Sequence, residues 1–507
     1  MRLAKQNTPQ DELLRTVQSS SSQPNDFKAI LIEKSRKHKV ALLAEIKRAS
    51  PSKGHIANVD PVAQAITYAL AGAATISVLT EPHWFKGSLH DLAAVRAALN
   101  KAGLATTTCV LRKDFIIDEY QLLEARSAGA DTALLIVASL SPEELARLMA
   151  FSRNLGMEPL VEVATEGEMR TALAANASVI GINNRDLHTM EVDMSKTARL
   201  CRLVPANADI VILSLSGVAT RADVESFIDA GASGILVGES LMRAPSPPAF
   251  IREILALPHP RTLCKICGVR DAEAATWAVD AGADFIGMIF APSKRKVTEE
   301  EAQSIVRAVR KRRPRQETWV APSLSFRPVD GQDDVDGMGK WFEVWSLLFR
   351  HATLLGGPLT VGVFVDATVE EMNGVAERVG LDIIQLHGSE GWKIAHELVR
   401  PTIRVMHMDP GVDSDAVLSK LEAGYAAAAL LDSRGGGTGK AFNWKVGVDV
   451  QARAPFILAG GLTVDNVSSA IQQVKPWCVD VSSGVESDGV KNRLKIEAFV
   501  RNAREAL

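Results

Sequence analysis

The sequence predicts an α/β protein made of two consecutive (β/α)8 barrels, and two observations lead to this prediction. First, the chain has 507 residues, 47% of them hydrophobic, which suits two domains of about 250 residues, the usual size of such a barrel. Second, one pattern recurs: a helical segment ends in Gly or another small residue, and an apolar, often β-branched run follows at once. Clear examples are residues 70–79, 127–137, 229–237 and 280–288.

The glycine of this pattern suits the left-handed position that ends a helix and turns the chain into a strand. Runs that are apolar on both faces and alternate with helices pair in parallel. The first half has such runs at 42–47, 75–79, 106–112, 133–137, 159–163, 179–183, 210–214 and 234–237. The second half has them at 263–267, 284–289, 360–365, 382–386, 402–406, 427–431, 456–459 and 478–482. Eight strands twice over favour two TIM barrels, because an open doubly wound sheet needs fewer strands per half.

The domain boundaries follow from the places where this alternation of strands and helices is interrupted. We expect a flexible lead over residues 1–25, which ends in a serine run, and a first barrel over 26–257. The linker-like Pro258–Pro260 precedes a second barrel over 262–507. An insertion at 314–358 contains Pro-rich, acidic and aromatic segments, and we interpret it as a peripheral, partly mobile excursion between a helix and the next strand.

Composition excludes several classes of protein. A net charge of −3 gives no reason to expect nucleic acid or an acidic membrane as a partner. Five cysteines are too few and too scattered for a disulfide framework. The N-terminus lacks an apolar signal core, and no apolar run approaches the length of a membrane span. We therefore expect a cytoplasmic protein.

The first chemically informative stretch is Leu42–Gly54. Strand alternation places Glu45 and Lys47 on the same side at the end of an apolar run, and a loop with Ser50 follows. A carboxylate and an ammonium group at this place suit an anionic substrate. The alternative is an ion pair on an edge strand, although the apolar run indicates a buried strand.

Further polar residues end other predicted strands of the first half, where barrels gather their chemistry. They are Lys113, Glu162, Asn183 and, just beyond, Arg185. Singly, each could be a buried ion pair or a surface charge, but together they favour a site. Ser216-Gly217 and Gly238-Glu239 follow the last two predicted strands, where many barrels hold a phosphate.

These residues lie in stretches that resemble the indole-3-glycerol-phosphate synthase family: 44–52, 112–115, 161–162, 181–187 and 236–242. The resemblance implies a decarboxylating carbon–carbon lyase that closes the pyrrole ring of a carboxyphenylamino deoxyribulose phosphate, losing CO2 and water. It implies that Lys113 is the general acid on the substrate carbonyl and that Lys47 holds the substrate carboxylate and assists proton transfer. Glu162 and Glu45 are implied as base and electrostatic support, and Asn183 as a positioning residue.

The sequence departs from this family at one position. Many members carry Glu just before the Ser-Gly pair, whereas this chain has Leu215. An auxiliary substrate contact is therefore missing or supplied by another residue. This departure bears on the rate of the first domain.

The second half contains two motifs that fail as metal or nucleotide sites. Cys264 and Cys267 form a C-x-x-C, but residues i and i+3 of a strand lie on opposite faces, so their sulfurs cannot converge without a turn. The glycine-rich run 435–440 lacks the hydroxyl residue and the opening glycine of a P-loop. Cys267 remains as a possible acid–base thiol at a strand end.

The remaining strand-end residues of the second half resemble phosphoribosylanthranilate isomerase over roughly 262–507. The resemblance is carried by Cys267, Arg295, His387, Asp432, Gly436–Gly439, Phe442–Trp444 and the glycine-rich ends 459–462 and 480–484. It implies an intramolecular oxidoreductase that performs an Amadori rearrangement. Asp432 is implied as the acid that opens the furanose, Cys267 as the base at C2, and Arg295 as the partner of the anthranilate carboxylate. Asp480 is implied as a supporting residue, and Gly460, Gly461, Ser483 and Gly484 as the phosphate site. His387 is either a site residue or a hydrogen-bonded strand-end histidine.

Together the resemblances imply a bifunctional enzyme for consecutive steps of tryptophan biosynthesis, acting on small phosphorylated molecules with no cofactor and no metal. The layout resembles fungal versions in which these domains follow a glutamine amidotransferase. An amidotransferase or anthranilate synthase subunit or domain is therefore an implied partner, and the chain is either complete or part of a longer protein. Two alternatives remain open: a non-catalytic scaffold that binds sugar phosphates, and a protein in which Leu215 marks decay of the first active site.

Overall fold

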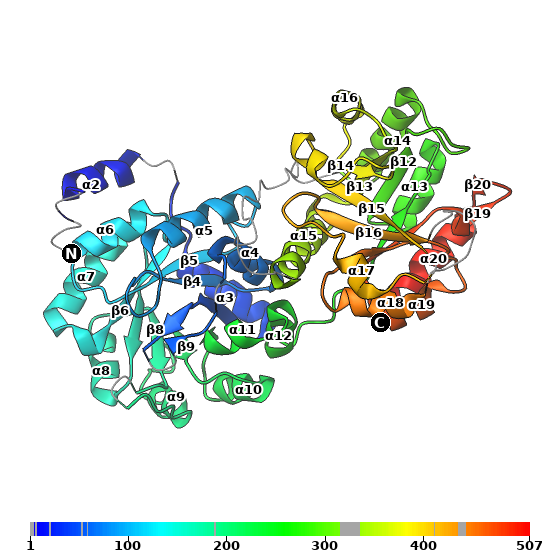
Figure 1. The fold of residues 1–507 in the computed structure, drawn as a ribbon. Coiled ribbons are helices and arrows are strands. Elements are labelled where there is room, and N and C mark those ends of the chain that lie inside the picture. Colours follow the sequence, from blue (N-terminus) through cyan, green and yellow to red (C-terminus); the bar gives the residue numbers. More distant parts are fainter. Residues whose placement is uncertain are drawn as a thin grey trace. The chain divides into compact units, whose positions relative to one another are not determined.

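The computed structural model describes residues 5, 8–19, 22–51, 54–57, 59–186, 189–314, 335–409, 411–433 and 443–506. The chain forms two compact units, Met1–Pro258 and His259–Leu507. Each unit contains a closed barrel of eight strands that pair in parallel, and Figure 1 shows helices around both barrels. The predicted fold class of two consecutive TIM barrels is confirmed.

The first unit alternates barrel strands with helices. Its barrel strands are β1 Ala41–Ile46, β4 Thr75–Leu79, β5 Cys109–Lys113, β6 Thr132–Ile136, β7 Leu160–Val163, β8 Val179–Asn183, β9 Val211–Leu215 and β10 Gly234–Val237. Its helices are α2 Gln10–Ser19, α3 Phe27–His38, α4 Pro61–Ala71, α5 Leu89–Lys101, α6 Glu119–Ser127, η1 Val137–Ser139, α7 Pro142–Asn154, α8 Glu166–Ala174, α9 Ser195–Cys201, α10 Arg221–Asp229, α11 Glu239–Arg243 and α12 Pro247–Ile254. A small hairpin, β2 Ala49–Ser50 with β3 Gly54–His55, follows β1.

The second unit repeats the alternation. Its barrel strands are β11 Leu263–Ile266, β12 Phe285–Ile289, β13 Leu359–Phe364, β14 Ile383–Leu386, β15 Thr402–Met408, β16 Ala428–Ser433, β17 Ile457–Leu458 and β18 Cys478–Val481. Its helices are α13 Ala272–Ala281, α14 Glu299–Arg312, α15 Val335–Gly356, α16 Val369–Val379, η2 Lys393–Glu397, α17 Ser414–Leu418, α18 Trp444–Gln451, α19 Val467–Val474, η3 Ser483–Val485 and α20 Arg493–Arg504. A hairpin of β19 Glu486–Ser487 and β20 Val490–Lys491 follows β18.

In both barrels the strands pair in chain order, and the last strand closes on the first. This order follows from helical crossovers between successive parallel strands.

The strand at 75–79 lies where the apolar pattern predicted it, whereas β5 begins at Cys109, later than the expected 106. The cause is a turn, in which the N–H of Thr107 donates to the carbonyl of Leu104 at 3.2 Å.

Glycine ends helices of the second barrel as the pattern predicted. Gly282 has a φ of 94° at the C-cap of α13, and its N–H donates to the carbonyl of Ala278 at 3.1 Å. Gly380 has a φ of 79° at the end of α16. Both values lie in the left-handed region, which a residue with a Cβ adopts at a cost.

Part of the expected flexible lead is helical. Helix α2 packs against α6, where Leu13 joins Tyr120 and Leu123 in a small apolar cluster. The Tyr120 hydroxyl donates to the carbonyl of Thr8 at 2.9 Å. The lead is therefore attached to the outside of the first barrel through this cluster.

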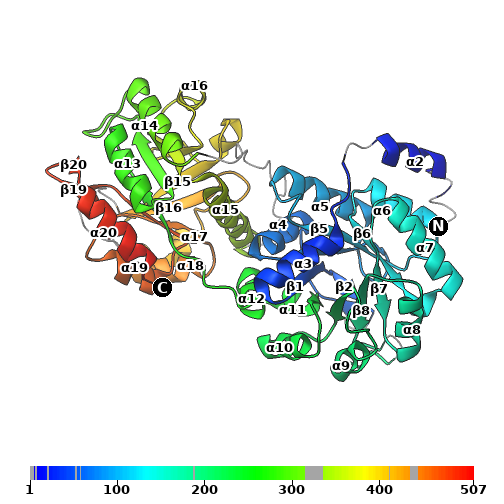
Figure 2. The ribbon, with the colours of Figure 1, turned by 180° about the vertical axis from the view of Figure 1, so that it is seen from behind.

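Helix α3 closes the N-terminal end of the first barrel. Its residues Phe27, Ile30 and Leu31 share one buried apolar cluster with inward-facing residues of the strands, such as Leu43 and Leu213. Figure 2 shows α3 lying in front of these strands when the molecule is seen from behind. Because its side chains fill that end of the barrel, the opposite, C-terminal end is the one available for a cavity.

Helix α15 closes the same end of the second barrel. The Trp341 indole N–H donates to the carbonyl of Ala426 at 2.7 Å, just before β16. Phe349 stacks on Trp477, just before β18, with ring centroids 5.9 Å apart, and meets the edge of Phe285 in β12 at 6.0 Å. Arg350 donates to the carbonyl of Trp477 at 3.1 Å.

These contacts correct one expectation. The aromatic part of the 314–358 insertion is not a peripheral excursion, because its side chains are buried against the strand starts of the second barrel. Residues 315–334 of the insertion lie outside the described residues. The aromatic side chains of the insertion are what allow α15 to seal the barrel.

Among the described residues, no helix combines the length and apolar character that crossing a membrane requires.

Candidate functional site

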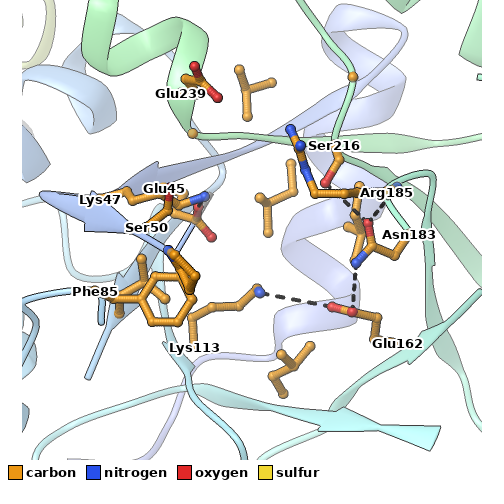
Figure 3. Close-up of a pocket in the computed structure, with 18 of the residues that line it drawn as sticks. Glu45, Lys47, Ser50, Phe85, Lys113, Glu162, Asn183, Arg185, Ser216 and Glu239 are labelled. Atoms are coloured by element: carbon orange, nitrogen blue, oxygen red, sulfur yellow. Dashed lines mark hydrogen bonds and ion pairs between the residues drawn. The ribbon is translucent and has the colours of Figure 1, made fainter. Parts of the chain in front are cut away.

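A cavity of about 720 Å³ opens at the C-terminal ends of the strands of the first barrel. Glu45, Lys113, Glu162 and Asn183 all line it, each from a different strand. Figure 3 shows these side chains pointing toward one another around the cavity. The polar strand-end residues of the first half are thus brought together.

On one wall, Lys47 and Glu45 form a close ion pair, with Nζ 2.5 Å from Oε1. Glu45 is only 2% exposed. Burial alone would raise the pKa of this carboxyl, but the ammonium groups of Lys47 and Lys113 outweigh burial and hold the pKa below its ordinary value. Glu45 is therefore a fixed negative charge in the wall of the cavity.

On the other wall, Glu162 is oriented by a chain of hydrogen bonds. The Asn183 amide donates to Glu162 Oε1 at 2.8 Å, and the Ser216 hydroxyl donates to the Asn183 side-chain oxygen at 3.1 Å. The backbone N–H of Arg185 donates to the same oxygen at 3.0 Å. The second carboxylate oxygen, Oε2, faces Lys113 Nζ at 3.9 Å. That separation exceeds a hydrogen bond, so the Lys113 ammonium group can donate to a substrate atom that enters between them.

The cavity also has apolar walls that the sequence reasoning missed. The barrel strands line it with Leu134, Ile136, Leu215 and Leu236. The loops that follow the strands line it with Trp84, Phe85 and Phe115. Trp84 is 65% exposed and Phe115 is 50% exposed, which is unusual for large apolar side chains. The only signal available in the sequence was aromatic residues immediately beyond predicted strands.

Leu215 belongs to this apolar wall. It is 2% exposed, and an added Cβ on Gly181 would lie 2.7 Å from its Cδ1. Gly181 is the neighbour of Glu162 in the register of β7 and β8. The position where many relatives of the resembled family carry Glu is thus filled by an apolar side chain next to the carboxylate wall.

The expected anion-binding residues lie at the rim of the same cavity. Ser50, Arg185, Ser216, Gly217, Gly238 and Glu239 all line it. Ser216 and Gly217 have φ values of 69° and 96°, so this turn is held in the left-handed region. An added Cβ on Gly238 would lie 2.6 Å from Glu45 Oε1, so a larger residue there would displace the carboxylate.

In the second barrel, Cys267 lies just beyond β11 and is 6% exposed. Burial raises the pKa of its thiol, while the Lys265 ammonium group opposes this shift. Lys265 is fully buried, and its Nζ lies 3.0 Å from Asp480 Oδ1. Asp480 outweighs burial and raises the pKa of Lys265, so the ammonium group stays charged beneath the thiol.

Asp432 ends β16 and is 8% exposed. Burial, with the Asp480 charge adding to it, raises the pKa of Asp432 to about 6. His387 Nε2 lies 3.9 Å from Asp432 Oδ2. Burial, followed by the neighbouring His407, lowers the pKa of His387 to about 4. The pair therefore consists of a neutral imidazole and a carboxyl group that still holds a proton in mildly acid solution.

Arg295 has a partner that the sequence reasoning did not foresee. Its Nε and Nη2 donate to both oxygens of Glu486, at 2.7 and 2.8 Å. Lys491 also donates to Glu486 Oε1 at 2.8 Å. Burial alone would raise the pKa of Glu486, but Arg295 and Lys491 lower it to about 2. The guanidinium group thus already holds one carboxylate from the chain itself.

The glycine-rich ends of the second barrel pack on one another. Gly460 and Gly461 follow β17 with φ values of 81° and 68°. An added Cβ on Gly484 would overlap the backbone oxygen of Leu462, so the loops after β17 and β18 lie in contact. Ser483 begins the short η3 turn beside them. The stretches Gly436–Gly439 and Phe442 lie outside the described residues.

Sequence reasoning missed Lys265, Glu486 and Lys491. Lys265 lies in β11, two residues before Cys267, which directly follows the strand. Continued alternation therefore places both on the inner face, and this signal was available. Glu486 and Lys491 lie in the β19–β20 hairpin, and their sequence carries no signal that they meet Arg295.

Comparison with known proteins associates each half of the chain with a family. Residues 1–254 match the sequence model described as indole-3-glycerol phosphate synthase. Residues 343–502 match the one described as N-(5'-phosphoribosyl)anthranilate (PRA) isomerase. Cys267 and Arg295 precede this second matched range.

Three curated relatives span most of the chain. A multifunctional tryptophan biosynthesis protein of Phycomyces blakesleeanus is 46% identical over 496 residues, which cover 92% of this chain and 62% of that protein. A protein of the same name from Schizosaccharomyces pombe is 43% identical and covered to 60% of its length, across 93% of this chain. The tryptophan biosynthesis protein TRP1 of Phytophthora nicotianae is 43% identical over 88% of both chains. The chain thus spans only 62% and 60% of the first two relatives.

Proposed function

Because the chain belongs to the indole-3-glycerol phosphate synthase family in its first half and matches the PRA isomerase family in its second, we propose that it is a bifunctional enzyme of tryptophan biosynthesis. The second barrel isomerises N-(5-phosphoribosyl)anthranilate to the carboxyphenylamino deoxyribulose phosphate. The first barrel cyclises and decarboxylates that product to indole-3-glycerol phosphate. The chain therefore consumes in one barrel what it forms in the other.

One observation carries the synthase assignment: the Lys113 ammonium group faces the oriented Glu162 carboxylate across 3.9 Å inside a largely apolar cavity. Closing the ring requires a proton for the ketone oxygen and a base for a later proton. Lys113 is positioned to supply the first and Glu162 the second. The Glu45 charge, held by Lys47, stabilises the cationic intermediate, and the apolar wall accepts the aromatic ring.

The phosphate is bound at the rim by the Ser216-Gly217 turn and the Gly238-Glu239 loop. Both lie on the cavity rim after the last two strands, where barrels commonly hold phosphate. Arg185 and Ser50 complete the rim from two other strand ends. Asn183 keeps Glu162 in place through the 2.8 Å hydrogen bond.

In the isomerase, Asp432 is the acid that protonates the ring oxygen of the furanose, and Cys267 is the base that takes the C2 proton. Support comes from the raised pKa of Asp432, which retains a proton, and from Lys265, which favours the thiolate. Arg295 holds the anthranilate carboxylate through Nη1, the edge that Glu486 does not occupy. Gly460, Gly461, Ser483 and Gly484 bind the phosphate, and His387 borders the acid.

We also propose that an amidotransferase or anthranilate synthase subunit or domain works with this chain. The relatives named multifunctional are longer than the part that this chain covers, which leaves room in them for a further activity.

A coupled assay tests the two-site assignment. Full-length protein is supplied with N-(5-phosphoribosyl)anthranilate, and both products are followed by chromatography. We expect Lys113→Ala to abolish indole-3-glycerol phosphate formation and to let the isomerised intermediate accumulate at close to the wild-type rate. Asp432→Asn is the reciprocal control: it should block the first step, while synthesis from supplied intermediate continues.

Each alternative gives a different result. A non-catalytic scaffold would bind the substrate and form neither product. Decay of the first site at Leu215 would give intermediate but no indole product in the wild-type protein. Loss of both activities in folded Lys113→Ala would contradict separate sites.

A further inference from the structure

Three side chains with metal-ligand chemistry meet at the C-terminal ends of adjacent strands of the second barrel. His387 follows β14, His407 lies in β15 and Asp432 in β16. One ligand atom from each lies within 4.8 Å of the other two. The imidazole rings of His387 and His407 are 5.0 Å apart between centroids. We call these three residues the His–His–Asp cluster.

The barrel holds this cluster in place. His407 and Asp432 are register partners of β15 and β16, so their side chains leave the same face of the sheet. The N–H of His387 donates to the carbonyl of Phe364 at 2.9 Å, which fixes the residue to the neighbouring strand. Ligands carried by adjacent strands, or placed directly at a strand end as His387 is, are positioned more rigidly than ligands carried by long loops.

The donor set suits a divalent transition-metal ion. Two imidazoles and one carboxylate leave open positions for water or another ligand, and imidazole suits zinc, copper, iron and nickel. Donors around one zinc ion lie about 3.3 Å apart, given bonds of about 2.0–2.1 Å in a tetrahedron. His387 Nε2 and Asp432 Oδ2, at 3.9 Å, must therefore close only slightly. His407 is exposed, so its ring can rotate and its side also offers a route of entry.

Binding an ion here breaks few existing interactions. His387 Nδ1 is buried and, within the described chain, has no hydrogen-bond partner. His407 Nε2 lies 3.4 Å from the backbone oxygen of His387, which is a long and weak contact. The desolvation of the His387 imidazole has thus already occurred in the fold, whereas His407 remains exposed to solvent.

The positive charges near the cluster are paired with carboxylates. Two positive groups act on His387, and each has its own carboxylate at 3.0 Å: Lys265 is paired with Asp480, and Arg404 with Glu390. The carboxylate of Asp432 then adds negative charge to the cluster.

From this geometry we propose that His387, His407 and Asp432 form a binding site for a divalent transition-metal ion of the zinc type. An ion bound there coordinates the Asp432 carboxylate, which then cannot act as the acid. The ion therefore inhibits the isomerase and leaves the synthase active. The site itself stands on the cluster alone, whereas the inhibition rests on the proposed function of Asp432.

Calorimetric titration of the full-length protein with zinc chloride tests the site directly. We expect His407→Ala to lose one bound ion, or to bind it at least about tenfold more weakly than the wild type. His396→Ala is the matched control, since His396 is an exposed histidine of the same barrel that contacts Tyr425. The control should bind zinc as the wild type does.

A cysteine is the main competing ligand. If Cys267→Ser abolishes the same binding event and His407→Ala leaves it unchanged, zinc is held by the thiol and the proposal is wrong. Equal stoichiometry and affinity in wild type and His407→Ala would also overturn it.

The isomerase assay with added zinc chloride tests the consequence. We expect zinc to inhibit the isomerase of the wild type and of His396→Ala, while His407→Ala needs at least about tenfold more zinc. The synthase rate from supplied intermediate is the internal control and should not change. If the zinc-free protein lacks isomerase activity, the proposed function fails, and the calorimetry still decides whether the metal site exists.

Discussion

In the second barrel, burial raises the pKa values of the Cys267 thiol and the Asp432 carboxyl group. The two shifts have opposite consequences for catalysis. A raised pKa keeps the proton on Asp432, which suits an acid, but reduces the thiolate fraction of Cys267, which must act as a base. Lys265, which lies beneath the thiol, opposes the effect of burial and favours the thiolate, and Lys491 acts in the same direction.

Cys267→Ser and Asp432→Asn should each lower kcat of the isomerase by at least about a hundredfold, with little change in KM. A serine hydroxyl is a far weaker acid than a thiol, so almost no conjugate base forms, and Asn has no transferable proton. Steady-state kinetics on both variants check this, with synthesis of indole-3-glycerol phosphate from supplied intermediate as the control. Near-normal turnover in Cys267→Ser would remove that residue from the mechanism.

The pH dependence of kcat/KM should report Asp432. Below about pH 6 Asp432 keeps its proton, and each pH unit increases the thiolate about tenfold, so the rate rises. Above about pH 6 the loss of protonated Asp432 cancels the gain in thiolate, and the rate levels off until the thiol pKa is reached. This change of slope near pH 6 is a bend in the pH–rate profile, and rates measured between about pH 5 and pH 8 locate it.

The substrate phosphate also titrates near pH 6, so this experiment needs a second variant. Asp432→Glu should move the bend, because it changes the acid and leaves the substrate unchanged. A bend that stays in place in Asp432→Glu, or a wild-type rate that rises steadily to pH 8, would contradict the assignment.

Among the elements, α15 has the clearest role in stability. Phe349 is fully buried between Trp477 and Phe285, whereas Leu354 of the same helix is 75% exposed. Phe349→Ala should lower the free energy of unfolding of the second unit by about 3–5 kcal/mol. Leu354→Ala, the matched control, should stay within about 0.5 kcal/mol. Urea unfolding followed through isomerase activity measures both, and equal effects would show that α15 does not seal the barrel.

The elements also show how far sequence reasoning extends. Strands such as Thr75–Leu79 were predicted because an apolar run between two helices is typical of a buried parallel strand. The aromatic segment of the 314–358 insertion, around Trp341–Trp345, was evident in the sequence, but the sequence could not say where it docks. Docking depends on contacts with Ala426 and Trp477, far along the chain.

The same limit applies to the sites. Glu45, Lys113 and Glu162 were found because each ends a strand, and strand ends of a closed barrel converge. The pairing of Arg295 with Glu486 could not be found, because it joins a loop after β12 to a hairpin after β18. His407 was passed over because its strand carries no motif, and only the register with Asp432 reveals its position.

At the scale of the whole molecule, each unit has its own barrel and its own buried core. Phe227 belongs to the core of the first unit, as Phe349 belongs to that of the second. Phe227→Ala should therefore lower the temperature at which synthase activity is lost and leave isomerase inactivation unchanged, while Phe349→Ala should do the reverse. Activity after timed heating measures both, and parallel losses would show that the units unfold as one.

The docking of α15 has a consequence for biosynthesis. The helix is translated before the residues it covers around β16 and β18, including Ala426 and Trp477. On the ribosome the docking surface of its aromatic face stays incomplete until nearly the whole second unit has emerged, because Phe285 precedes the helix but Trp477 follows it late. A stalled or truncated chain would expose Trp341 and Phe349 to solvent and to chaperones. An incomplete second barrel can therefore be recognised by the exposed aromatic side chains of α15.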